Sequence, residues 1–216
     1  MIYKNDVIKI ERFSLEYALD VDGNREAFRE AIFFDLEHYV YKKPICIGVF
    51  GACCYNNGEL QLTQYMIENK KDSIKILEMA EQYFKKQKNE NDKKYLVTFS
   101  GNNDYTMIKY LFKKNGIDFD INEQFIHVDL QKYYEKYMGV CTGLKKLEKI
   151  FEIDRESELI SGTNLAKTFS KIVKDDDYIN RMSKDKIKKI LLYNEQDIVS
   201  LFHMYINWNK YVSNNQ

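Results

Sequence analysis

Apolar and polar positions follow two different periods along the chain, and these periods predict its secondary structure. Short apolar runs predict strands over 31–37, 46–54, 59–66, 95–99 and 125–128. Apolar residues spaced by about 3.6 positions predict helices over 73–86, 104–114, 130–138, 144–151, 164–173 and 184–205. Between the second and third apolar runs, Asn57-Gly58 is typical of the tight turn of a β-hairpin.

The order of these segments predicts the fold class. Because a hairpin comes first and strands then alternate with helices, we expect an α/β fold with a five-stranded mixed sheet flanked by helices. Three strands of this sheet would be antiparallel and two more parallel. Pro44 is the one proline of the 216 residues, and no linker rich in Gly, Ser or Pro interrupts the chain. We therefore expect a single domain over residues 1–216, with its core at about 30–208.

Composition narrows the setting in which the protein works. Lys and Arg together number 33 and so do Asp and Glu, so any binding of nucleic acid must rely on local patches of lysine. No apolar run approaches the roughly 20 residues of a membrane helix, and the first residues lack the pattern of a signal peptide. The four cysteines lack the paired spacing of a zinc site, and we expect them to be buried free thiols: Cys46, Cys53, Cys54 and Cys141. These features predict a cytoplasmic protein.

Candidate chemistry begins in the first predicted strand, where Asp35 and Glu37 stand two residues apart. Side chains alternate across a strand, so these two acids share one face, and the other face carries Ile32, Phe34 and Leu36. Neighbouring carboxylates repel each other, and a divalent cation with oxygen ligands would offset that repulsion. The alternative is an exposed strand end with two solvated acids.

Asp104 is a second candidate, because it follows the predicted strand 95–99. Ligands gather at the carboxyl ends of parallel strands in α/β sheets. An Asp just before a helix is also typical of an N-cap, so a cap and a metal ligand are both open for Asp104. The same choice exists for Asp129, where a cap is favoured.

The last predicted helix carries a third candidate. Tyr193 and Asp197 are four residues apart and therefore adjacent on one side of the helix. Asn194 falls near the middle of the apolar face, which suggests that the helix crosses an opening in the core. Asp197 lies on the flank of that face, where either a metal ligand or an acid at the solvent edge would fit.

Taken in order, these residues resemble the DEDD exonuclease superfamily of RNase-H-like folds in its tyrosine-bearing (DEDDy) version. More narrowly, the chain resembles the YprB-like RNase-H-like domain. The matching stretches are 34–37, 99–104, 127–130, 142–147 and 193–197. Tyr193-Asn194 with Asp197, followed by an apolar helix, is the most specific of them. The histidine-bearing version has its His where this chain has Leu192, so the tyrosine version fits better.

The resemblance implies a 3′-to-5′ exonuclease that hydrolyses phosphodiester bonds of DNA or RNA at a single-stranded end. It implies that two Mg²⁺ or Mn²⁺ ions are held by four carboxylates, those of Asp35, Glu37, Asp104 and Asp197. It also implies that Tyr193 orients the attacking water. Phosphates of the substrate would need cations, and the candidates are lysines that otherwise form a solvated helix face: Lys145, Lys146, Lys149, Lys167 and Lys171.

Two departures from the family pattern open an alternative function. The chain has Ser100-Gly101 and then Asn103-Asp104 where the family has Asn-Gly and then Phe-Asp. His38 stands where the family has Thr. The alternative is a catalytically degenerate module that has lost its metals and binds nucleic acid or a partner protein. Stabilisation by Mn²⁺ distinguishes the two, because a degenerate site should gain little from it.

Overall fold

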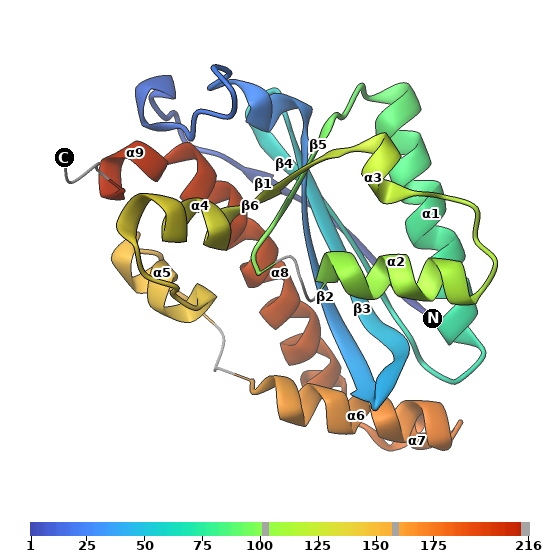
Figure 1. Cartoon of the computed structure of the whole chain (residues 1–216). Coiled ribbons are helices and arrows are strands. Elements are labelled where there is room, and N and C mark those ends of the chain that lie inside the picture. Colours follow the sequence, from blue (N-terminus) through green and yellow to red (C-terminus); the bar gives the residue numbers. More distant parts are fainter. Residues whose placement is uncertain (101–103, 157–159, 213–216) are drawn as a thin grey trace.

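A computed structural model describes residues 1–100, 104–156 and 160–212. Within these residues the strands form one mixed six-stranded sheet in the order β1-β4-β3-β2-β5-β6 (Figure 1). The strands are β1 (Ile2–Lys9), β2 (Ala31–Tyr41), β3 (Lys43–Asn56), β4 (Glu59–Met66), β5 (Tyr95–Thr98) and β6 (Ile126–Asp129). Antiparallel pairs join β1 to β4, β4 to β3 and β3 to β2, whereas β5 and β6 run parallel to β2. The predicted α/β class and mixed sheet are confirmed.

Helices cover both faces of this sheet. Two short 3₁₀ helices, η1 (Leu15–Tyr17) and η2 (Ala27–Glu30), precede β2. The α-helices are α1 (Asp72–Glu90), α2 (Asp104–Lys114), α3 (Ile121–Gln124), α4 (Leu130–Met138), α5 (Leu144–Ile150), α6 (Gly162–Lys174), α7 (Tyr178–Arg181), α8 (Lys184–Ile206) and α9 (Trp208–Tyr211). In Figure 1, α1 and α2 lie on one side of the sheet, and α8 lies on the other with α4 and α5. Of the helices described, none has the length and apolar character to cross a membrane.

The apolar pattern does not predict β1, the sixth strand. Its middle is the polar run Lys4-Asn5-Asp6, and it pairs along one side only, from Ile2 opposite Met66 to Lys9 opposite Glu59. An edge strand with an exposed face needs few apolar residues, so the alternation that marks the other strands is blurred here.

The predicted hairpin turn is confirmed, and the thiols are as expected except at one position. Asn57 and Gly58 have φ angles of 47° and 88° between the paired strands β3 and β4, as the favoured two-residue turns require. All four cysteines are free; Cys46, Cys53 and Cys54 are buried in β3. Cys141 is exposed, contrary to expectation, because it lies in the connection between α4 and α5 and not in the core.

Alternation along β2 divides the core into two clusters. Ile32, Phe34 and Leu36 pack into a cluster that includes apolar residues of α1 and α2. Phe33 packs on the opposite side, with its ring centroid 5.4 Å from that of Phe202 and 5.8 Å from that of Tyr205, both on α8. The face of β2 that carries the odd-numbered residues is therefore the one that α8 covers.

Gly51 of β3 allows α8 to come this close. A Cβ atom at this position would overlap Oδ1 of Asn194 and Cδ1 of Ile198, two side chains of α8. The helix and the sheet are thus packed so tightly at this point that only a hydrogen atom fits between them.

We predict that Gly51→Ala lowers the free energy of unfolding by about 1–3 kcal/mol, the usual result of overfilling a packed core. Gly162→Ala is the matched control, because a Cβ there has no neighbour within 4 Å and should change stability little. Urea denaturation measures both variants. Equal stability of the two variants would contradict the close approach of α8.

Candidate metal centre

Three carboxylates meet between β2 and α8. One oxygen atom from each of Asp35, Glu37 and Asp197 lies within 4.8 Å of the others. Asp35 and Glu37 project from β2 on the face that α8 covers, as the alternation predicts. Glu37 and Asp197 are buried and Asp35 is half-buried. These side chains therefore belong neither to an exposed strand end nor to the solvent edge of a helix.

A neutral amide donor fixes the position of Asp35. Asn194 on α8 is completely buried, and its Nδ2 donates to Oδ2 of Asp35 at 2.8 Å and to the Asp35 carbonyl at 3.3 Å. Its Oδ1 accepts from Nε2 of Gln64 at 2.8 Å, and the same nitrogen donates to the carbonyl of Leu191 at 2.9 Å. The polar break in the apolar face of α8 is thus a chain of hydrogen bonds that runs from β4 to the cluster.

Asp104 lies beside the cluster but outside the group of three. It is the first residue of α2, it is buried, and its Oδ1 is 3.9 Å from Nε2 of His38. Burial lowers the pKa of His38, so this histidine adds little positive charge. Residues 101–103 of the same sequence motif lie outside the described residues.

Asp129 caps a helix, as the sequence favours. It precedes α4, and its Oδ1 accepts from the backbone nitrogens of Gln131 at 3.0 Å and Ser100 at 3.1 Å. The side chain that caps α4 therefore also accepts a hydrogen bond from the backbone of Ser100, which follows β5.

Two basic side chains contact the cluster at Asp197. Nζ of Lys145 and Nη2 of Arg155 both contact Oδ1 of Asp197. A further buried carboxylate, Glu148, lies behind them, 3.8 Å from Nζ of Lys145 and 3.6 Å from Nη1 of Arg155. The sequence predicts that Lys145 binds nucleic acid, but it does not point to Glu148 or Arg155.

Gln64 is also not singled out by the sequence, and the sequence signals for Gln64 and Arg155 differ in strength. Gln64 replaces an apolar residue in the inward series Leu60, Leu62 and Met66 of β4. Such a break of pattern is readable in the sequence. Arg155 lies in an irregular connection, where no period predicts which way a side chain points.

Tyr193 lies under the two cations. Nζ of Lys145 is 4.5 Å and Cζ of Arg155 is 5.0 Å from the centroid of its ring. Burial, followed by the charge of Asp197, raises the pKa of the Tyr193 phenol above its usual range. The phenol is therefore neutral at physiological pH and can donate a hydrogen bond.

The carboxylates of the cluster hold protons more tightly than exposed acids do. Burial raises the pKa of Asp197 to about 7, although Arg155 acts in the opposite direction. Burial, and then the charges of neighbouring carboxylates, raise the pKa values of Asp35, Glu37 and Asp104 well above normal. Buried acids that repel one another in this way are a suitable set of ligands for a hard divalent cation, which would relieve the repulsion.

The remaining lysine candidates fall into two groups. Lys146 and Lys149 are exposed on α5. Lys167 and Lys171 of α6 line a pocket of about 370 Å³ together with Lys186 and Lys189 of α8. The structure thus adds two lysines that the sequence does not single out, and it places four lysines around one pocket.

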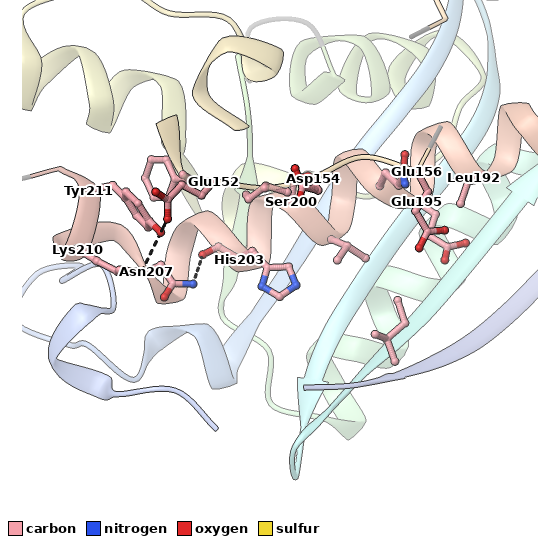
Figure 2. Close-up of a pocket in the computed structure, with 15 residues that line it drawn as sticks. Glu152, Asp154, Glu156, Leu192, Glu195, Ser200, His203, Asn207, Lys210 and Tyr211 are labelled. Carbon is pink, nitrogen blue, oxygen red and sulfur yellow. Dashed lines mark hydrogen bonds between the residues drawn. The ribbon is translucent and has the colours of Figure 1, made fainter. Parts of the chain in front are cut away.

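A separate hollow of about 510 Å³ lies on another side of α8 (Figure 2). Its charged lining residues are mainly acidic and include Glu152, Asp154, Glu156 and Glu195. The three clustered carboxylates are not among the described residues that line it. An acidic lining disfavours phosphate, so we do not place the predicted chemistry in this hollow.

Comparison with known families agrees with the fold and the cluster. A family model described as RNase_H superfamily matches residues 32–209, and the chain therefore belongs to the RNase H superfamily. No curated protein matches the chain. The resemblance drawn from the motifs is thus confirmed at the level of the superfamily, and the buried acidic cluster is a possible metal site within it.

We predict that the metal-free protein loses stability as pH rises from about 4 to about 7. Carboxylates ionise near pH 4 in the unfolded chain, whereas Asp197 in the folded chain has a pKa of about 7. The folded state binds more protons than the unfolded state in this window, so raising the pH favours unfolding. Urea denaturation with a chelator present, at several pH values, measures the effect.

Asp197→Asn should flatten this dependence, because it removes one of the raised carboxyl groups. Asp154→Asn, at an exposed acid of a neighbouring loop, is the control and should retain the wild-type slope. A wild-type stability that increases across the same window would contradict the prediction.

Proposed function

We propose that the protein is a metal-dependent nuclease, and more narrowly a 3′-to-5′ exonuclease of the YprB-like, tyrosine-bearing kind. The observation that carries the proposal is the cluster of Asp35, Glu37 and Asp197 within 4.8 Å of one another in a chain of the RNase H superfamily. A nucleic acid is accordingly the substrate class, and DNA and RNA are both open.

Four acidic residues would hold two Mg²⁺ or Mn²⁺ ions: Asp35, Glu37, Asp104 and Asp197. Ions bound there would activate a water molecule and stabilise the leaving oxygen of the phosphodiester. The hydrogen bonds of Asn194 to Asp35 support this role, because they hold one carboxylate in a fixed orientation before any ion binds. Asp104 would complete the set from the first residue of α2, where burial comes first and the charges of Asp35 and Asp197 come next in raising its pKa.

Tyr193 would orient the attacking water and would not take its proton. Its raised pKa keeps the phenol protonated, so it cannot take the proton of the water, and its O–H group remains available as a donor. The cations above its ring limit the directions in which the ring can turn. Both features support a positioning role.

Lysines outside the cluster would bind phosphates further along the substrate. The pocket lined by Lys167 and Lys171 supports this part of the proposal better than Lys146 and Lys149, which are exposed on α5. A chain whose charges balance overall needs such local concentrations of lysine to bind a polyanion.

One observation favours the second candidate, a degenerate module without metals. Lys145 and Arg155 already compensate part of the charge of Asp197, as they would in a site that no longer binds ions. Metal binding is therefore the first property to measure.

We predict that Mn²⁺ raises the melting temperature and that Asp35→Asn abolishes the increase. A ligand that binds only the folded state at a hundredfold excess over its Kd stabilises it by about 2.7 kcal/mol. Asp154→Asn is the control and should retain the full response. No increase in the wild-type protein would favour the degenerate module.

We also predict that single-stranded oligonucleotides labelled at the 5′ end are shortened stepwise from the 3′ end in the presence of Mn²⁺. Tyr193→Phe should lower the single-turnover rate by on the order of ten- to a hundredfold, because the water is no longer held in line. Tyr110→Phe, at an exposed tyrosine of α2, should leave the rate unchanged. An unaltered rate in Tyr193→Phe would remove the positioning role, and internal cuts would replace exonuclease by endonuclease action.

A further inference from the structure

Arg155 is built into the candidate metal centre, although it belongs to the irregular connection between α5 and α6. Only 10% of its side chain is exposed. Its Nη2 contacts Oδ1 of Asp197 and donates to the carbonyl of Tyr193 at 3.3 Å. Its guanidinium also lies over the ring of Tyr193, so three contacts orient it toward the cluster.

A second buried carboxylate, that of Glu148, lies close to Arg155. Its side chain is 2% exposed, and its Oε2 lies 3.6 Å from Nη1 of Arg155. Arg155 therefore stands between two buried carboxylates, of which Asp197 belongs to the cluster of three and Glu148 does not. If Asp197 were occupied by a cation, Glu148 would still hold the guanidinium in place.

Arg155 also has donors to spare. Among the described residues, its Nε and Nη1 make no hydrogen bond, and Nη1 faces Oε2 of Glu148 only at the longer distance of 3.6 Å. A guanidinium has five N–H groups in a planar fork, a geometry that matches two oxygens of a phosphate. Buried donors without acceptors are costly, and a ligand that supplies oxygens would remove this cost.

The charges around Arg155 point to the same ligand. Asp35, Glu37, Asp104, Asp197 and Glu148 with Lys145 and Arg155 carry a formal charge of minus three. Two divalent cations would change this to plus one, which the single negative charge of a phosphodiester neutralises. Without Lys145 and Arg155, the same site with two divalent cations bound would be negative and would repel the phosphate.

We propose that Arg155 is a phosphate-binding residue of this site and that Glu148 is its positioning residue. The guanidinium holds Asp197 while the carboxylates carry no cation, and it exchanges Asp197 for a phosphate oxygen of the nucleic acid when they do. This inference rests on the proposed function, because it requires cations on the carboxylates.

The residues on either side of Arg155 have a different environment. Asp154 and Glu156 line the acidic hollow on the other side of α8 (Figure 2). The connection thus turns one basic side chain toward the cluster and two acidic side chains away from it. Of Asp154, Arg155 and Glu156, only Arg155 has the charge and the position to bind a phosphate at the cluster.

Two calorimetric titrations test the proposal on the full chain. The first measures the Kd of Mn²⁺, and the second measures the Kd of adenosine 5′-monophosphate and its deoxy form at saturating Mn²⁺. Arg155→Met should bind Mn²⁺ more tightly than the wild type, because a competitor for Asp197 is gone. The same variant should bind the nucleotides at least about tenfold more weakly, because a charge-assisted donor is lost.

Opposite shifts of the two affinities separate this role from a structural one. Arg25→Met removes the same charge from an arginine with a 49% exposed side chain and should change neither affinity. Weaker or unchanged Mn²⁺ binding by Arg155→Met overturns the exchange. Unchanged nucleotide binding, or none by the wild type, overturns the role in phosphate binding.

The result for the wild type tells a failure of this inference from a failure of the proposed function. A wild-type protein that binds no Mn²⁺ removes the metal-dependent nuclease and this inference together. Normal Mn²⁺ binding with an Arg155→Met variant that behaves like the wild type removes this inference alone.

A second variant covers the case in which Arg155→Met does not fold, as thermal unfolding would reveal. Arg155→Lys retains a charge beside Glu148 and Asp197 but loses the planar fork. We expect weaker nucleotide binding with Mn²⁺ binding at least as tight as in the wild type. Unchanged nucleotide binding in Arg155→Lys would overturn the proposal.

Discussion

Negative charge is buried between β2 and α8, and the polar contacts around it offset the cost of that burial. Carboxylates within 4.8 Å of one another repel, and burial removes the water that would screen them. The chain supplies neutral donors to Asp35 through Asn194 and cations to Asp197 through Lys145 and Arg155. Because these partners lie on different elements, the same cluster that repels internally also ties α5, α8 and the sheet together.

The close approach of α8 to the sheet is part of this arrangement. Asn194 reaches the backbone and the side chain of Asp35 only because Gly51 leaves room for it on β3. Around the polar contact the apolar residues of β2 and α8, such as Phe33 and Phe202, exclude water. Apolar packing therefore places the helix, and the buried hydrogen bonds fix the geometry of the acids within it. This division of roles suits the proposed metal site, because partners outside a set of ligands orient those ligands for a cation.

The balanced total charge of the chain conceals a strong local separation of charge. Acidic side chains line the hollow near α9, whereas four lysines surround the pocket between α6 and α8. The carboxylates and the two basic side chains of the candidate metal centre form a third group. A polyanionic substrate would meet favourable charge only along the lysines and at a centre loaded with cations, which is the arrangement that the proposed nuclease requires.

Features that depend on local periodicity could be predicted from the amino-acid sequence. Alternation put Asp35 and Glu37 on one face of a strand, Asn57-Gly58 set a hairpin, and a helical period put Asn194 in the middle of an apolar face. The burial of Asp197, the hydrogen bond of Gln64 to Asn194, and the positions of Glu148 and Arg155 beside the cluster follow from contacts between distant elements. Local periods report which way a side chain faces within its own element. They do not report which distant element it meets, and pairings such as that of Arg155 with Asp197, 42 residues apart, are set by the packing of the whole chain.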